Sequence, residues 1–357
     1  MTRWLCAALA ILALLTGCSS GTPSQQLTAE GAVEVSGSAV PADRDETGTS
    51  DGAAADATEP GRDVLLVDEP LPVMPAPTPQ LPVTVDSADG PTVEVADVSR
   101  ILPLSGGVAE VVYTLGLGEA MVGRDEQATF AEVADLPVVT DAHSVSAESV
   151  LSLQPTVVIG DTLTGPPEAL DAIRGAGVPV VLVPEAWTLE DIYPRIQAVA
   201  DALGVTGAGA ELIDATRQRV DAAGAQPLEP APTVAFLYLR GTAGVYLLGG
   251  DGSGADALIE AAGGIDAGSA LGLAPFTPLT SEALVSAAPD VLLIMSRGLE
   301  SVGGMDGLAE VPGIAQTPAG ASGDVIVVDD GLLLSFGART PAVVEYLAGQ
   351  LRGWAAP

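Results

Sequence analysis

A motif that occurs twice constrains the fold of this chain more than any other feature of its sequence. Residues 146–155 lead into the apolar run 156–159, and residues 280–289 lead into the apolar run 291–294. In both copies a Glu is followed seven residues later by a Pro: Glu148 by Pro155, and Glu282 by Pro289. A Ser or Thr with a Glu suits a helix start, and Pro ends the helix ahead of the strand. Two copies of this helix-and-strand unit predict two related α/β lobes.

The rest of the pattern agrees with an α/β fold class. In the first half we expect strands at 101–104, 156–159 and 180–183, separated by helices at 108–117 and 168–176. The second half repeats the alternation between residues 233 and 352. Such alternation predicts mostly parallel sheets covered by helices. Residues 188–224 carry apolar positions at helical spacing with a break at 204–209, and we expect this long helix to bridge an N-terminal lobe (81–187) and a C-terminal lobe (225–357).

The N-terminus has the features of an export signal. Arg3 precedes an apolar run at 4–15, and Leu15-Thr16-Gly17-Cys18 matches a lipobox. The run is too short to span a bilayer comfortably, so we expect residues 1–17 to be a cleaved lipoprotein signal peptide and Cys18 to carry the lipid. An ordinary signal peptide with an incidental Cys is the alternative. Because Cys6 leaves with the signal, the folded part has no Cys, which excludes disulfides, thiol catalysis and iron–sulfur clusters there.

Residues 18–80 read as a tether. They are rich in Ser, Gly, Thr, Pro, Ala and acidic residues and contain no aromatic residue, so we expect them to be disordered and dispensable for binding. A hairpin signal around Asp89-Gly90 then places the start of the folded part at residue 81. The net charge is -34, and every one of the 13 basic residues is Arg. This charge argues against nucleic acid and anionic lipid headgroups as partners.

Three residues are candidates for metal ligation or its support. His143, the single His, follows a short expected strand at 138–139, and α/β sheets bind ligands at the carboxyl ends of their strands. Tyr238 and Arg240 are two apart at the end of an apolar strand, so they share one face of it. The alternatives are a surface His, and an edge Tyr beside a solvated Arg. One His is too few for a zinc or manganese site, and the chain has no Walker A or Gly-x-Ser-x-Gly motif.

Two segments resemble a known family. Residues 100–125, which include Arg100-Ile101-Leu102-Pro103-Leu104-Ser105-Gly106-Gly107, resemble the opening lobe of the haem-binding proteins of ABC importers, and residues 298–308 resemble their later cleft loop. The resemblance covers 81–357 and implies two α/β lobes joined by one long helix, with a ligand cleft between them. It implies an extracytoplasmic, lipid-anchored monomer that passes ferric haem to a permease and its ATPase without catalysis. Ferric-siderophore and cobalamin binders share the strand, helix and repeat pattern. A haem-handling or metal-inserting enzyme on the same scaffold, and a structural or adhesive lipoprotein, are the alternatives from other classes.

The resemblance also implies roles for particular residues. His143 and Tyr238 match the positions of two axial haem ligands, and Arg240 matches an Arg that hydrogen-bonds the Tyr. Many relatives instead use a first-lobe Tyr where this chain has Asp141, which favours the His and Tyr pair. The remaining expectations are of two kinds. Some residues are expected to contact the ligand in the cleft, where backbone N–H groups could hold a haem propionate. Others are exposed carboxylates that are expected to dock on the permease. The cleft contacts are Ser105, Gly106, Met295 and Met305; the docking residues are Glu110 and Asp256, with Glu260 as a rival to Asp256.

Overall fold

The computed structural model describes residues 64–65, 74–141, 144–224 and 228–355, which all lie in one compact unit, Glu59–Pro357. The predicted signal peptide, Cys18, most of the predicted tether and His143 lie outside the described residues. None of the helices within these ranges is both long enough and apolar enough to cross a membrane.

The N-terminal lobe is built on a short parallel sheet in the order β4-β7-β8. Its strands are β4 (Ile101–Pro103), β7 (Val157–Asp161) and β8 (Val180–Val183). All three strands are buried, so both faces must be covered by helices. One face packs on α1 (Gly106–Val112) and α4 (Ile192–Ala202), and the other on α2 (Ala147–Ser152) and α3 (Pro167–Gly175). The parallel α/β lobe predicted from the alternation is therefore present.

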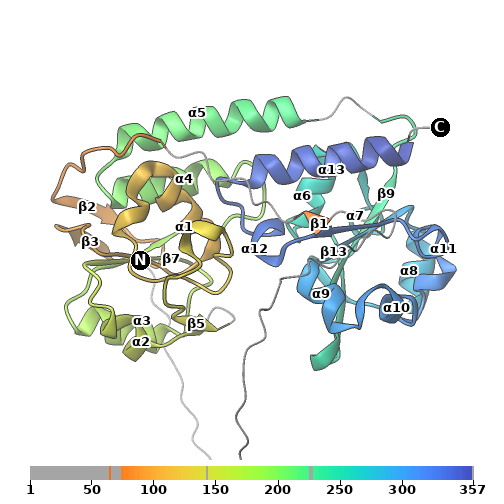
Figure 1. Cartoon of the computed structure of the whole chain (residues 1–357), viewed down its shortest axis with the longest axis horizontal. Helices are drawn as coiled ribbons and strands as arrows, with labels where there is room; N and C mark the ends of the chain where they lie inside the picture. Colours follow the sequence, from red (N-terminus) through yellow and green to blue (C-terminus); the bar gives the residue numbers. More distant parts are fainter. Residues whose placement is uncertain (1–63, 66–73, 142–143, 225–227, 356–357) are drawn as a thin grey trace, which may run out of the picture. The chain divides into compact units, whose positions relative to one another are not determined.

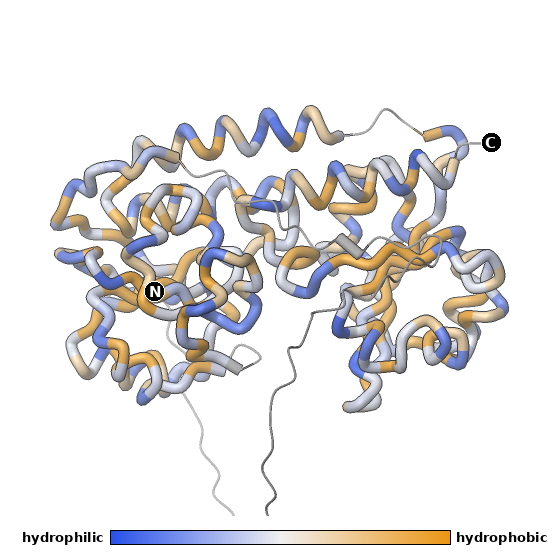
Figure 2. Tube along the Cα trace, viewed as in Figure 1, coloured by the Kyte–Doolittle hydropathy of each residue, from blue (hydrophilic) through white to orange (hydrophobic). Residues whose placement is uncertain are grey.

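The C-terminal lobe is built on a larger mixed sheet in the order β1-β14-β13-β9-β10-β12, with β11 paired to β9. Its strands are β1 (Val64–Leu65), β9 (Thr233–Arg240), β10 (Val245–Gly249), β11 (Ile265–Asp266), β12 (Phe276–Pro278), β13 (Val291–Met295) and β14 (Val325–Val328). These strands are hydrophobic over much of their length (Figure 2). Along β9, Val234 and Phe236 pack on one face of the sheet while Ala235 and Leu237 pack on the other, as the two-residue period of a strand requires.

Helices cover both faces of the second sheet. The face that holds Phe236 packs on α6 (Ala255–Ala261) and α13 (Thr340–Ala355), and the face that holds Leu237 packs on α8 (Ser281–Ala287) and α10 (Gly304–Ala309). Short helices α7 (Ala267–Ala270), α9 (Ser296–Ser301), α11 (Pro318–Ser322) and α12 (Asp330–Leu333) link the strands. The repeated motif forms α2 before β7 and α8 before β13. Ser146 and Thr280 cap these two helices through their side-chain oxygens.

The predicted bridging segment forms two helices, separated close to the break that the sequence predicts. Helix α4 ends at Ala202, and α5 (Thr206–Ala223) begins after three intervening residues. Between them, Gly204 has φ +71, and a Cβ there would lie 2.6 Å from the carbonyl oxygen of Gln80. Helix α4 packs within the N-terminal lobe, whereas α5 runs beside both α4 and α13 (Figure 1). Within residues 188–224, it is thus α5 that packs on a helix of the C-terminal lobe.

The predicted start of the folded part at residue 81 is also wrong. The backbone of Val64–Leu65 pairs with β14 as an edge strand of the C-terminal sheet. In the N-terminal lobe, the N–H of Met74 donates to the carbonyl of Thr114 over 2.8 Å, and the N–H of Gln80 donates to that of Gly204 over 2.8 Å. Because these groups are hydrogen-bonded into the fold, parts of the predicted tether belong to it. The hairpin of β2 (Val83–Asp86) and β3 (Thr92–Val95) lies where the sequence predicts it.

Candidate functional site

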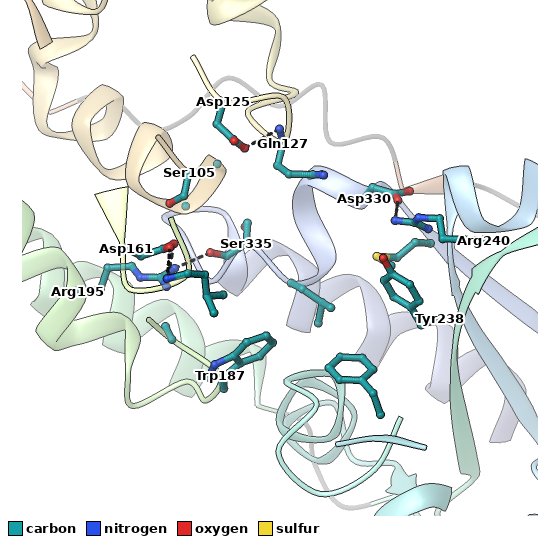
Figure 3. Close-up of a pocket in the computed structure, with 18 residues that line it drawn as sticks. Ser105, Asp125, Gln127, Asp161, Trp187, Arg195, Tyr238, Arg240, Asp330 and Ser335 are labelled. Carbon is teal, nitrogen blue, oxygen red and sulfur yellow. Dashed lines mark hydrogen bonds and ion pairs between the residues drawn. The ribbon is translucent and has the colours of Figure 1, made fainter. Parts of the chain in front are cut away.

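Strands of both lobes end at one cavity, which residues from each lobe line. Parallel strands place their carboxyl ends at one edge of a sheet, where ligands bind in α/β folds. The cavity residues follow this rule in both sheets (Figure 3). At or just after the ends of β4, β7, β8, β9, β13 and β14 stand, in that order, Ser105, Asp161, Trp187, Arg240, Met295 and Asp330.

The cavity has large apolar and aromatic walls. Trp187 comes from the N-terminal lobe and Tyr238 from the C-terminal lobe, and they lie on opposite sides of the cavity (Figure 3). Phe276, on β12, meets the ring of Tyr238 edge-on at a centroid distance of 6.0 Å. Leu163 is 44% exposed although it lines the cavity. Exposed apolar and aromatic surface of this kind suits a large, flat, partly apolar ligand.

Tyr238 and Arg240 line the cavity together at the end of β9, as strand alternation predicts. The guanidinium carbon of Arg240 lies 4.5 Å from the ring centroid of Tyr238. The contact between the two is therefore a cation–π stack, whereas the resemblance implied a hydrogen bond to the phenol oxygen. Arg240 also donates from Nη1 to the carbonyl of Leu239 over 2.8 Å and from Nη2 to Oδ1 of Asp330 over 2.9 Å. A cation is thus held against the ring of the candidate iron ligand.

A second arginine, Arg195 of α4, is buried in the wall of the N-terminal lobe. Its Nη1 donates to the carbonyl of Ser335 in the C-terminal lobe over 2.9 Å, and its Nη2 lies 3.8 Å from Oδ2 of Asp161. Burial lowers the pKa of the Arg195 guanidinium, and the carboxylates of Asp161 and Asp191 oppose that shift. The two arginines that line the cavity are therefore each accompanied by an aspartate of the same lobe.

The segment that leads to His143 is tied to the cavity wall. The strand β5 (Thr140–Asp141) comes directly before the undescribed residues 142–143, and β6 (Ser144–Val145) follows them. The hydroxyl of Thr140 donates to Oδ2 of Asp125, which lines the cavity. The N–H of Gln127 donates to the other oxygen of Asp125 over 2.8 Å. His143 itself lies outside the described residues, so its ligand role stays a prediction.

The predicted cleft contacts divide into residues that line the cavity and one that does not. Ser105, Gly106 and Met295 line it, and Ser105 also accepts from the N–H of Val108 at the start of α1. Met305 lies on α10 and packs against the opposite face of the C-terminal sheet, so its assignment to the cleft is wrong. The expected cleft loop at 298–308 forms most of α9 and α10.

The two predicted docking carboxylates differ in exposure. Glu110 is fully buried and bonded to Arg339 through both carboxylate oxygens, so the prediction of an exposed docking residue is wrong there. Complete burial raises the pKa of the Glu110 carboxyl, and the guanidinium of Arg339 opposes this. Asp256 is half-buried in the first turn of α6 and accepts from the N–H of Gly252 over 2.8 Å. Glu260 is exposed on the same helix. The docking role of Asp256 stays a prediction.

Several cavity residues were not predicted from the sequence, although most of them share a recognisable position. Asp161, Trp187 and Asp330 each stand at or shortly after the end of a parallel strand that the sequence did predict. Applying the strand-end rule to every predicted strand, not only to the segment before His143, would have found them. Arg195 carried no such signal, because it lies within the helical stretch that was read as a bridge.

Comparison with known proteins identifies the family. Residues 101–332 match the family model described as Periplasmic binding protein. The chain belongs to this family. The matched residues include the cavity-lining ends of β4, β7, β8, β9, β13 and β14.

Solved structures of the family align over most of this chain. The periplasmic heme-binding protein RhuT from Roseiflexus sp. RS-1, in apo form, is 40% identical with a TM-score of 0.69, over 73% of this chain and 100% of that chain. The heme binding protein HmuT is 38% identical with a TM-score of 0.73, over 82% of this chain and 95% of that chain. Solved variants of HmuT replace a His, and a Tyr and an Arg two positions apart, by Ala.

Curated relatives match a shorter part of the chain. The uncharacterized ABC transporter substrate-binding lipoprotein YvrC of Bacillus subtilis is 29% identical over 136 residues, which are 37% of this chain and 43% of that protein. A vitamin B12-binding protein of Vibrio parahaemolyticus is 28% identical over 104 residues, 29% of this chain and 38% of that protein. The matched region thus spans less than half the length of these two relatives.

Proposed function

We propose that this chain binds ferric haem in the cavity between its lobes and delivers it to the permease and ATPase of an ABC importer. The observation that carries the proposal is Tyr238 at the end of β9, stacked against Arg240 in an aromatic-walled cavity. Phenolate is an established ligand of ferric haem. A neighbouring guanidinium favours the ionised phenol, which is the form that binds iron.

The comparisons support haem over other cargo. RhuT and HmuT are both named for heme binding and align with most of this chain. The Tyr and Arg replaced in the HmuT variants have the same two-residue spacing as Tyr238 and Arg240. A His is replaced in a third HmuT variant, in keeping with the role that we assign to His143 as the second axial ligand.

The cavity offers separate surfaces to the two parts of haem. Trp187 and Phe276 supply aromatic area for the macrocycle. Ser105 and Gly106, at the start of α1, offer polar groups that we assign to a propionate. Ligands on both lobes couple iron binding to the relative position of the lobes. This coupling is a means by which the permease could distinguish loaded from empty protein.

The proposed setting is the outer face of the cell membrane. A lipid on Cys18 anchors the exported chain there as a monomer, and Asp256 is the carboxylate that we assign to permease docking. The match to a lipoprotein of an ABC transporter supports the anchor and the transporter partnership. We assign the protein no catalytic step.

An absorbance titration of the purified chain with haemin, cobalamin and ferric siderophores tests the cargo. Haemin should bind at one equivalent with a Soret shift, and the other two should not compete with it. Saturable binding of cobalamin or a siderophore, without haemin binding, would overturn the proposal and favour the corresponding relatives.

Optical and EPR spectra of haemin-loaded variants test the ligands. Tyr238→Phe should lose the ferric phenolate signature, and His143→Ala should leave a Tyr-ligated, five-coordinate ferric haem. Tyr246→Phe is the matched control, because Tyr246 lies on β10 and packs against the other face of the sheet. Wild-type spectra in both Tyr238→Phe and His143→Ala would show that the ligands are assigned wrongly.

A further inference from the structure

Asp330 is a buried carboxylate that joins the ends of three strands at the cavity. Its side chain is 1% exposed, although it stands at the cavity wall just after β14. Its Oδ2 accepts from the N–H of Arg297 over 2.8 Å and from the hydroxyl of Ser296 over 3.2 Å, both just after β13. Its Oδ1 accepts from Nη2 of Arg240, at the end of β9, over 2.9 Å. A buried carboxylate is stable only with such donors, so Asp330 has a defined position.

This contact restricts where the guanidinium of Arg240 can lie. Asp330 holds Nη2 (Figure 3), and the carbonyl of Leu239 holds Nη1. Because both terminal nitrogens of the guanidinium are hydrogen-bonded, only a few of the possible side-chain rotamers of Arg240 are compatible with these bonds. The one observed places the guanidinium carbon 4.5 Å from the ring centroid of Tyr238. The bonds to Asp330 and Leu239 therefore hold Arg240 in the position in which it stacks on the ring.

The charges on the three residues are complementary. Arg240 is 28% exposed along its side chain, so without Asp330 its cation would be free to turn toward solvent. The carboxylate keeps that cation in the cavity, against the ring of Tyr238. With a phenolate bound to ferric iron, the guanidinium would attract both the phenolate and the carboxylate.

From this geometry we propose that Asp330 is a positioning residue for iron coordination: by fixing Arg240 against Tyr238, it strengthens the bond between phenolate and ferric haem. The inference rests on the proposed function and assigns a role to a residue that is not one of the proposed iron ligands. Asp330 acts on the haem only through Arg240.

A double-mutant cycle tests this dependence. Haemin affinity and the optical and EPR spectra are measured for the wild type, Asp330→Ala, Arg240→Ala and the double variant. Asp330→Ala should weaken haemin binding about tenfold, within the range for a lost charge-assisted hydrogen bond. Its spectrum should approach that of Arg240→Ala, with a weaker phenolate signature than in the wild type. In the Arg240→Ala background, Asp330→Ala should change neither affinity nor spectrum.

The neighbouring carboxylate of Asp329 is the matched control. It caps α12 and accepts from the hydroxyl of Thr129 over 2.7 Å, and it is not a partner of Arg240. Any effect of Asp329→Ala should therefore be the same with and without Arg240, and the spectrum should stay that of the wild type. If Asp330→Ala weakens haemin binding equally with and without Arg240, the positioning role of Asp330 is overturned while the proposed function stands. A wild-type chain that binds no haemin would overturn the proposed function, and this role with it.

Discussion

Glu110 and Arg339, 229 residues apart in sequence, form a buried ion pair between the two lobes. Oε1 of Glu110 on α1 accepts from Nε and Nη2 of Arg339 over 2.9 and 2.7 Å, and Oε2 accepts from the Arg339 backbone N–H over 3.1 Å. Arg195 crosses between lobes in the opposite direction, from α4 to the carbonyl of Ser335. The lobes are thus joined beside the cavity by reciprocal arginine contacts, in addition to the packing of α5 on α13.

Replacing Glu110 by Ala should lower the free energy of unfolding by about 3–5 kcal/mol, because it leaves the buried guanidinium of Arg339 without its counter-charge. Chemical denaturation followed by circular dichroism measures this. Glu211→Ala, at an exposed position on α5, is the control and should change stability by less than about 0.5 kcal/mol. The double variant Glu110→Leu and Arg339→Met should recover much of the loss. If Glu110→Ala lowers the free energy of unfolding by less than about 1 kcal/mol, the ion pair does not join the lobes in solution.

Two glycines in helices provide a matched test of how closely the lobes approach. A Cβ on Gly107, in α1, would overlap the carbonyl oxygen of Ser335 and lie 2.8 Å from Nη1 of Arg195. A Cβ on Gly207, in α5, would meet nothing within 4 Å. Gly107→Ala should therefore destabilise the protein by about 1–3 kcal/mol and weaken haemin binding, because it pushes apart residues of both lobes at the cavity.

Gly207→Ala should leave the free energy of unfolding unchanged or raise it by up to about 1 kcal/mol, since Ala favours helix over Gly. Thermal unfolding and haemin titration of both variants are the measurements. Equal behaviour of the two variants would show that α1 does not pack against Ser335.

Features of the fold and site that follow from a periodic pattern could be predicted from the sequence. The two-residue period of a strand put Tyr238 and Arg240 on one face, and the helix caps and prolines marked the repeated units. The prediction failed where the burial of a residue depends on a contact between segments that are far apart in the sequence. Glu110 was expected to be exposed because the family resemblance implied a permease contact at its position. Yet Val108, Ala109, Val111 and Val112 around it are all buried, which indicates a helix enclosed on every side.

The boundary of the folded part was missed for a related reason. Val64–Leu65 are too few residues to carry a strand pattern, and their pairing depends on the free edge of β14, which the sequence does not display. Asp330 likewise is the first residue of α12, a four-residue helix that is too short to show a period. Its importance follows only from the donors that two strand ends, those of β9 and β13, bring to it.

Truncation at two points should separate the tether from the fold. A chain that begins at Glu59 should unfold at the same temperature as the mature chain, whereas one that begins at Pro79 should be less stable by about 2 kcal/mol or more. The shorter chain loses the pairing of Val64–Leu65 with β14, the hydrogen bond from Met74 to Thr114, and the packing of Met74 on the core. Differential scanning calorimetry of the two chains measures the difference. Identical unfolding of both would restore the predicted boundary at residue 81.

The last prediction concerns the pH dependence of stability through Asp266. This carboxylate caps α7, with Oδ2 accepting from the N–H of Ser269 over 2.7 Å, while Oδ1 is buried and without a hydrogen-bond partner among the described residues. Burial raises the pKa of the Asp266 carboxyl above its ordinary value, although the bond from Ser269 opposes this. A raised pKa means that the folded state binds the proton more tightly than the unfolded chain. The stabilising contribution of this group is therefore complete below the unfolded pKa and is lost as pH rises through the folded pKa.

Asp266→Asn should keep the cap, since Asn and Asp serve equally well there, and remove the buried charge. The stability of the variant relative to the wild type should therefore increase as pH rises from about 4 to about 7. Urea denaturation at a series of pH values measures the difference, with the exposed Asp135→Asn as a control whose relative stability should stay flat. A relative stability of Asp266→Asn that falls over this range would show that the folded state prefers the ionised carboxylate, against the direction that its burial predicts.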